Sequence, residues 1–79
     1  MGMIQAYVDG KTIRVRFLNG SKGEPHEVRL RLSGKGTQDD LIRVAAALDN
    51  TKAWKPITKS LFYESGLQHL NEEITNAQG

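Results

Sequence analysis

Four arginines alternate with apolar residues in two short segments of this chain. Residues 13–17 read Ile-Arg-Val-Arg-Phe, and residues 28–32 read Val-Arg-Leu-Arg-Leu. The four are Arg14, Arg16, Arg29 and Arg31. A period of two is typical of a strand with one buried and one solvent-facing side, so all four guanidinium groups would share the wet side. The planar donors of arginine suit phosphates and base edges, which predicts a polyanion-binding surface. The plain alternative is a solvated strand face.

A second basic segment, residues 34–37, reads Gly-Lys-Gly-Thr and precedes a predicted helix. Helix N-termini attract anions, so Lys35 is a candidate phosphate contact. The full spacing of a phosphate loop is absent, and Asp39 and Asp40 would repel a phosphate. A turn followed by a helix cap is therefore the favoured interpretation.

A third segment places the single tryptophan between cations. Lys52, Trp54 and Lys55 could extend a basic surface, with the indole ring stacked on a base. A lone tryptophan more often seals the edge of a hydrophobic core, and this second interpretation is favoured.

No pattern in the chain predicts catalysis or a metal site. His69 and Glu73 are four residues apart on a predicted helix, but zinc needs further nitrogen or sulfur ligands. The other histidine, His26, lies in a distant segment. No Ser-His-acid or paired-carboxylate arrangement can be defended. We therefore expect no enzymatic activity, no cofactor and no small-molecule substrate.

Length and composition predict one small domain. The chain has 79 residues and no cysteine, which excludes disulfides and thiolate metal sites. We expect a single domain over residues 3–76, with residues 1–2 as an addition and 77–79 as a frayed tail. No run approaches the roughly 18 apolar residues of a membrane span, and no secretory signal is visible, so we expect a cytoplasmic protein.

The charge is unevenly distributed along the chain. Residues 1–37 carry seven Lys or Arg against three acidic residues, whereas residues 38–79 carry four against six. The basic half is the half that contains the predicted strands. This asymmetry suggests an anionic partner.

Asp9-Gly10 between two alternating segments predicts a tight hairpin. With these two residues as the loop, Ala6 would face Ile13. The apolar residues of both strands then share one side. The other side carries Gln5, Tyr7 and Thr12 as well as the arginines.

A third strand over residues 27–32 is expected to pair with the second strand through a polar loop at 19–26. One register sets Arg16 opposite Arg29. The alternative sets Arg16 opposite Glu27 and Arg14 opposite Arg29. Both place arginine against arginine, which is mildly destabilising in a sheet.

Helical patterns follow the strands. Thr37, with Asp40 three residues later, predicts the cap of an amphipathic helix that ends at residues 49–50. Pro56 suits a first helical position, and residues 57–63 could form a helix or a fourth strand, of which we favour the helix. Ser65 predicts a second capping box. The predicted fold class is α+β, with a three-stranded antiparallel sheet packed on one amphipathic helix and one or two short C-terminal helices.

The order strand-strand-strand-helix with a basic open sheet resembles the three-stranded DNA-binding domains of AP2 type, including the arm-binding domains of phage integrases. The residues that carry the resemblance, over roughly residues 4–48, are Tyr7, Asp9, Gly10, Arg14, Val15, Arg16, Arg29 and Arg31. In that family the sheet face contacts DNA, which would correspond to the four arginines here. The chain departs from the family pattern after residue 50.

Two functions from different classes follow. The first is a small non-enzymatic nucleic-acid-binding module, with duplex DNA favoured, that acts as a monomer or weak homodimer. The alternative is a protein-binding module or inhibitor of phage or plasmid type that docks on an acidic or nucleic-acid-handling protein. Its anchors would be Tyr7, Leu18 and Trp54, since Tyr, Trp and Arg dominate interface hot spots.

Overall fold

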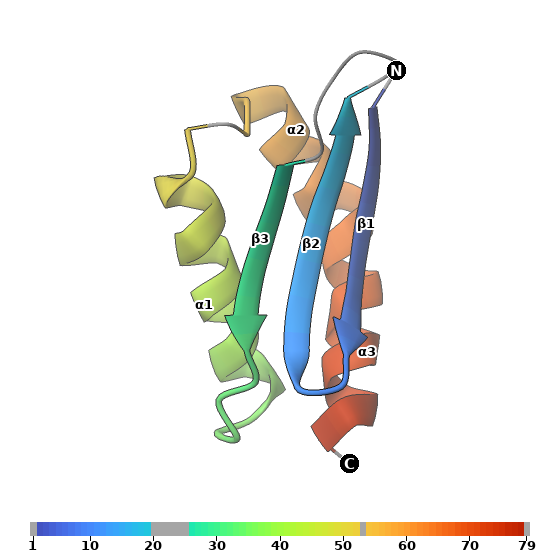
Figure 1. Ribbon diagram of the computed structural model, residues 1–79, viewed down its shortest axis with the longest axis vertical. Coiled ribbons are helices and arrows are strands. Elements are labelled where there is room, and N and C mark those ends of the chain that lie inside the picture. Colours follow the sequence, from blue (N-terminus) through green and yellow to red (C-terminus); the bar gives the residue numbers. More distant parts are fainter. Residues whose placement is uncertain (1, 20–25, 53, 79) are drawn as a thin grey trace.

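A computed structural model describes residues 2–19, 26–52 and 54–78. For residues 2, 3, 18 and 19 it describes the backbone alone. Three strands come first, β1 (Gly2–Asp9), β2 (Thr12–Asn19) and β3 (His26–Arg31). The helices are α1 (Thr37–Asn50), α2 (Pro56–Leu61), the π-helical turn η1 (Phe62–Gly66) and α3 (Leu67–Gln78). The strands form one antiparallel sheet in the order β1-β2-β3, with α1 and α3 on the same side of it (Figure 1). The predicted α+β class is confirmed.

The hairpin between β1 and β2 forms, but its predicted register is wrong by two residues. Ala6 pairs with Val15 instead of Ile13, and the loop is Gly10 and Lys11. Gly10 has φ +64°, and no non-glycine residue in the described segments has positive φ, so Asp9 stays in the strand. A glycine at the first loop position fits a type II′ turn. Because the shift is an even number of residues, each side chain keeps its predicted face.

The β2–β3 pairing follows the second of the two predicted registers. Arg16 lies opposite Glu27, and Arg14 lies opposite Arg29. Strand β3 begins at His26, one residue before the predicted start. Most of the expected loop falls on residues 20–25, which are outside the described residues.

The core lies between the sheet and the helices. It consists of Ala6, Ile13, Val15, Val28, Val44, Leu48, Trp54, Phe62, Leu70 and Ile74. The strand residues of this set alternate along each strand with the polar side chains of the other side of the sheet. The predicted amphipathic face of α1 contributes Val44 and Leu48. Because both helices pack on the apolar side, the other side of the sheet is left uncovered.

Helix α1 begins one residue earlier than predicted, and Thr37 is not its N-cap. Gly36 occupies that position, and no side chain caps the helix. The Thr37 hydroxyl instead lies 3.0 Å from that of Thr75 in α3. Asp40 is fully buried rather than part of a capping box. The helix ends at Asn50 as predicted, where the Thr51 hydroxyl donates to the Ala47 carbonyl at 2.8 Å.

The C-terminal part of the chain is helical from Pro56 to Gln78, so residues 57–63 are not a fourth strand. The predicted capping box at Ser65 is wrong, because this residue lies inside the helical run and its hydroxyl donates to the Leu61 carbonyl at 3.0 Å. The π-helical turn lies where Phe62 packs against Gly66. A Cβ on Gly66 would lie 2.7 Å from the Phe62 ring, so only glycine allows this approach. No helix in the described segments is long and apolar enough to cross a membrane.

Candidate nucleic-acid interface

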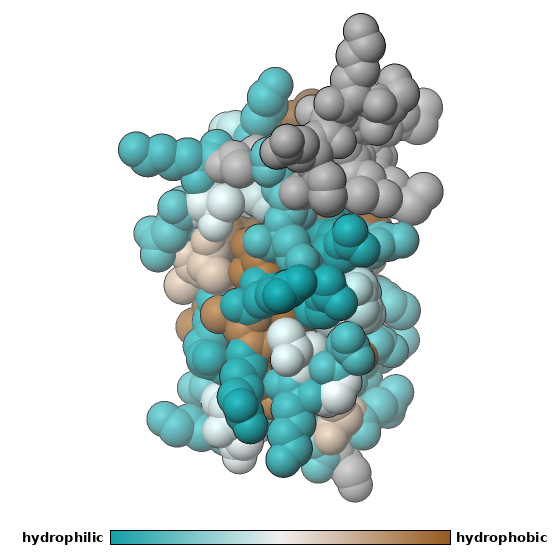
Figure 2. Space-filling view, viewed as in Figure 1, coloured by the Kyte–Doolittle hydropathy of each residue, from teal (hydrophilic) through white to brown (hydrophobic). Residues whose placement is uncertain are grey.

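The uncovered side of the sheet carries a mixed row of polar side chains on each strand. We call this surface the open face, and define it as Gln5, Tyr7, Asp9, Thr12, Arg14, Arg16, Glu27, Arg29 and Arg31. In the view of Figure 2, hydrophilic side chains lie over the part of the strands that is not drawn in grey, and hydrophobic surface shows between β3 and α1. The structure therefore gathers all four predicted arginines on one surface.

Glu27 lies among the arginines and relieves their crowding. Arg14 Nε donates to Glu27 Oε1, and Arg29 Nε donates to Glu27 Oε2 at 3.2 Å. The hydrogen bond from Arg14 is the largest cause that lowers the pKa of the Glu27 carboxyl, and it also raises the pKa of the Arg14 guanidinium. Both groups therefore stay charged at neutral pH. One carboxylate thus holds two arginines that the register sets opposite each other.

Arg14 is the most constrained of the four. Its Nη1 lies 3.5 Å from Asp9 Oδ2, and its guanidinium carbon lies 5.6 Å from the centroid of the Tyr7 ring. A cation over an aromatic face is attracted by the ring quadrupole. Tyr7 and Asp9 therefore fix the direction of Arg14 and leave it less free to reach a partner.

Arg29 and Arg31 are the arginines best placed to contact a ligand. The side chain of Arg29 is 65% exposed even with its contact to Glu27. Arg31 is exposed, and within the described segments it forms no ion pair. Arg16 is half-buried, and its Nε has no hydrogen-bond partner among the described residues. Among the described residues, the arginines of the open face therefore differ in exposure: those on β2 are half-buried and those on β3 are exposed.

The remaining predicted contacts divide between the two ends of the molecule. Lys35 is exposed in the loop between β3 and α1, at the same end as Arg31. Lys52 and Lys55 are exposed on the connection between α1 and α2, at the opposite end (Figure 1). The structure thus brings Lys35 to the arginine strand and separates the other two lysines from it.

Trp54 is part of the hydrophobic core, which is the role favoured from the sequence. The side chain is 2% exposed, and its ring centroid lies 5.8 Å from that of Phe17. It has no free face for a base or a partner protein. Of the other suggested anchors, Tyr7 is half-buried beside Arg14, and the side chain of Leu18 lies outside the description.

Two features of the surface were not predicted from the sequence. Lys11 is exposed in the β1–β2 turn and lies near Arg31 and Lys35, a proximity that depends on the observed register. Ile57 and Leu61 are 70% and 49% exposed on α2, and their spacing of four puts them on one side of the helix. The second signal was present in the sequence as an apolar pair beside Pro56.

No group of three or more His, Cys, Asp or Glu in the described part of the chain could hold a metal ion. Glu73, one of the predicted helix pair with His69, instead accepts a hydrogen bond from the Val8 N–H at 3.1 Å. It thereby covers an outward-facing donor at the β1 edge of the sheet.

Comparisons with family models, curated proteins and solved structures find no match to this chain. Function is therefore inferred from the geometry of the surface.

Proposed function

We propose that this protein is a small non-enzymatic module that binds nucleic acid, with duplex DNA favoured, through the open face of its sheet. The observation that carries the proposal is that one whole side of the sheet is uncovered by helices and holds four arginines. β-sheets bind in DNA grooves in several known recognition modes. Folding alone gives a weaker reason for this composition, because Arg14 opposite Arg29 is an unfavourable pair that needs Glu27 beside it.

The side chains have separate tasks in this proposal. Arg29 and Arg31 contact phosphates, because they are exposed and have the most freedom to reach a partner. Lys35 extends the contact at the end of β3. Arg14 is held by Glu27 and Asp9, so it orders the face and is not counted as a phosphate contact.

These three contacts set the expected salt dependence. Each neutralised phosphate contributes about −0.9 to the slope of log affinity against log salt on duplex DNA, so three contacts give a slope of about −2.7. Fluorescence anisotropy of a labelled duplex across a salt series measures this slope. Arg29→Gln should make it shallower by about 0.9.

A matched control is available at the other end of the molecule. Lys55→Gln removes the same charge from an exposed site on the α1–α2 connection, and it should leave the slope unchanged. Equal effects of the two substitutions, or salt-insensitive binding by the parent protein, would show that the open face is not the binding surface. An RNA duplex in parallel tests the preference for DNA.

A protein-binding module of inhibitor type is the second candidate. It is favoured by the exposed pair Ile57 and Leu61, because apolar side chains on one side of a surface helix are a usual docking feature. Recovery of one stoichiometric protein after nuclease treatment, lost in Ile57→Ser/Leu61→Ser, would support this candidate. Recovery of nucleic acid alone would count against it.

A further inference from the structure

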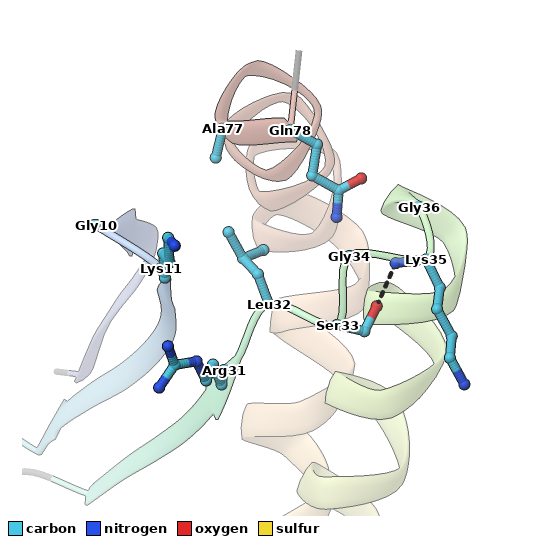
Figure 3. A pocket seen from close by; sticks show the side chains of 10 residues that line it. All are labelled: Gly10, Lys11, Arg31, Leu32, Ser33, Gly34, Lys35, Gly36, Ala77 and Gln78. Carbon is cyan, nitrogen blue, oxygen red and sulfur yellow. Dashed lines mark hydrogen bonds between the residues drawn. The ribbon is translucent and has the colours of Figure 1, made fainter.

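A groove lies at the end of the molecule where the β1–β2 turn, the β3–α1 loop and the end of α3 meet (Figure 3). Its volume is about 570 Å³. We call it the end groove. The residues that argue for a ligand are Lys11, Arg31, Leu32, Gly34, Lys35 and Gly36. A volume of this size falls within the range of about 300–1,000 Å³ that is usual for small-molecule sites.

The charges around the end groove are of one sign. Lys11 and Arg31 lie on one side, and Lys35 lies on the other with its ammonium directed outward (Figure 3). No acidic side chain is among the described residues that line it. Asp40, from the first turn of α1, is buried and turned inward, where Ser33, Arg43 and Gln78 donate to its carboxylate. The repulsion that the sequence predicted for a phosphate is therefore reduced.

The two glycines of the loop leave room for a ligand, whereas the N–H groups of Ser33 and Lys35 already donate to Asp40 and to the Ser33 hydroxyl. Gly34 and Gly36 have φ +78° and +126°, and a Cβ on either would meet no atom within 4 Å. The N–H groups of the first turn of α1 have no side-chain cap. No residue of α1 lines the groove, so the helix contributes only the positive end of its dipole, next to Gly36, to the attraction that the cations provide for an anion. Leu32 gives the groove an apolar surface between its basic sides (Figure 3).

We propose that the end groove binds a phosphorylated ligand of nucleotide size, with the phosphoryl group beside Lys11 and Arg31, which lie on the same side of the groove. Leu32 would contact the apolar part of the ligand. The ligand can be a free nucleotide or the phosphorylated terminal nucleotide of a nucleic-acid strand. The inference does not rest on the proposed function, because a free nucleotide would need no contact with the open face.

The test is a nuclear magnetic resonance titration of the ¹⁵N-labelled protein with adenosine monophosphate, with adenosine as the matched ligand without phosphate. Amide shifts at Gly34, Lys35 and Gly36 with the phosphorylated ligand alone are expected. A short oligonucleotide with and without a 5′-phosphate forms the second arm. A response in the first arm assigns the groove to free nucleotides, and a response in the second arm alone assigns it to strand ends.

Substitutions locate the binding. Lys11→Gln/Arg31→Gln should weaken binding about tenfold, at about threefold for each exposed charge pair. Lys59→Gln on α2, outside the groove, should leave it unchanged. Absence of phosphate-dependent shifts in both arms, or equal weakening by Lys59→Gln, overturns the inference. Duplex binding that still depends on Arg29 would then leave the proposed function standing, since Arg29 does not line the groove.

Discussion

Replacing Asp40 by asparagine should destabilise this protein more than the loss of any other single acidic charge in α1. The side chain is fully buried, although its position in the first helical turn suggests exposure. Its Oδ1 accepts from the Ser33 N–H at 3.0 Å and from Arg43 Nη1 at 2.7 Å. Its Oδ2 accepts from Gln78 Nε2 at 2.7 Å. One carboxylate thus joins the β3–α1 loop, α1 and the end of α3.

The expected loss follows from these three bonds. A hydrogen bond to a charged group contributes about 2 kcal/mol, against about 1 kcal/mol between neutral groups. In Asp40→Asn one carboxylate oxygen becomes an amide nitrogen, which cannot accept a hydrogen bond. The bonds from Ser33 and Arg43 weaken at the remaining neutral oxygen, and the Gln78 amide has to turn to accept from the new nitrogen. The free energy of unfolding should therefore fall by about 2 to 3 kcal/mol. The loss should lie nearer the lower end of this range, because the Arg43 side chain is 38% exposed and water screens its bond to the carboxylate. In a domain of this size such a loss lowers Tm by roughly 10 to 20 °C.

Urea unfolding followed by tryptophan fluorescence is the suitable assay. Trp54 is the single tryptophan and lies in the core, so its emission reports global unfolding. Asp39→Asn is the matched control, because it removes the same charge one residue earlier. It should cost less than about 1 kcal/mol, the scale of a helix-dipole interaction. Equal losses for the two variants would refute the role assigned to the buried carboxylate.

Three further predictions concern acid, packing and the open face. Burial alone would raise the pKa of Asp40, but hydrogen bonds from Ser33 and Arg43 outweigh it and hold the pKa below its usual value, as Arg14 does for Glu27. Both carboxyls therefore contribute to the free energy of unfolding above about pH 4, and this contribution is lost as the pH falls through their folded-state pKa values. In Asp40→Asn the free energy of unfolding should change less between neutral and acidic pH than in the parent protein, which urea unfolding at a series of pH values measures. Gly66→Ala should lower the free energy of unfolding in urea by about 1 kcal/mol, because the strain of a Cβ against the Phe62 ring exceeds the gain in helix propensity. In a Phe62→Leu background the same substitution should cost nothing. Glu27→Gln should steepen the slope of log affinity against log salt, because Arg14 loses its hydrogen-bonded carboxylate, keeps only the 3.5 Å contact with Asp9 and the Tyr7 ring, and can then reach a phosphate; an unchanged slope would contradict the restraint assigned to Glu27.

Local patterns in the sequence determined which side chains share a face. Period two along residues 13–17 and 28–32 put the arginines on one side of the sheet, and this assignment holds despite an error of two residues in the hairpin register. The reason is geometric, since alternate side chains of a strand point to opposite faces whatever their partners. The helical spacing of Val44 and Leu48, and Pro56 at a helix start, are equally local signals.

Tertiary structure decided what each charged group does. Glu27 lies beside Arg14 because two strands pair in one register, and Asp40 is buried because the end of α3 packs over it. Lys11, Arg31 and Lys35 surround one groove although they come from three segments. Such contacts depend on which segments pack together, and side-chain periodicity does not encode this. The sequence by itself therefore determined an arginine-bearing sheet face, and only the packing of the chain decided which cations are held by carboxylates and which are free to bind.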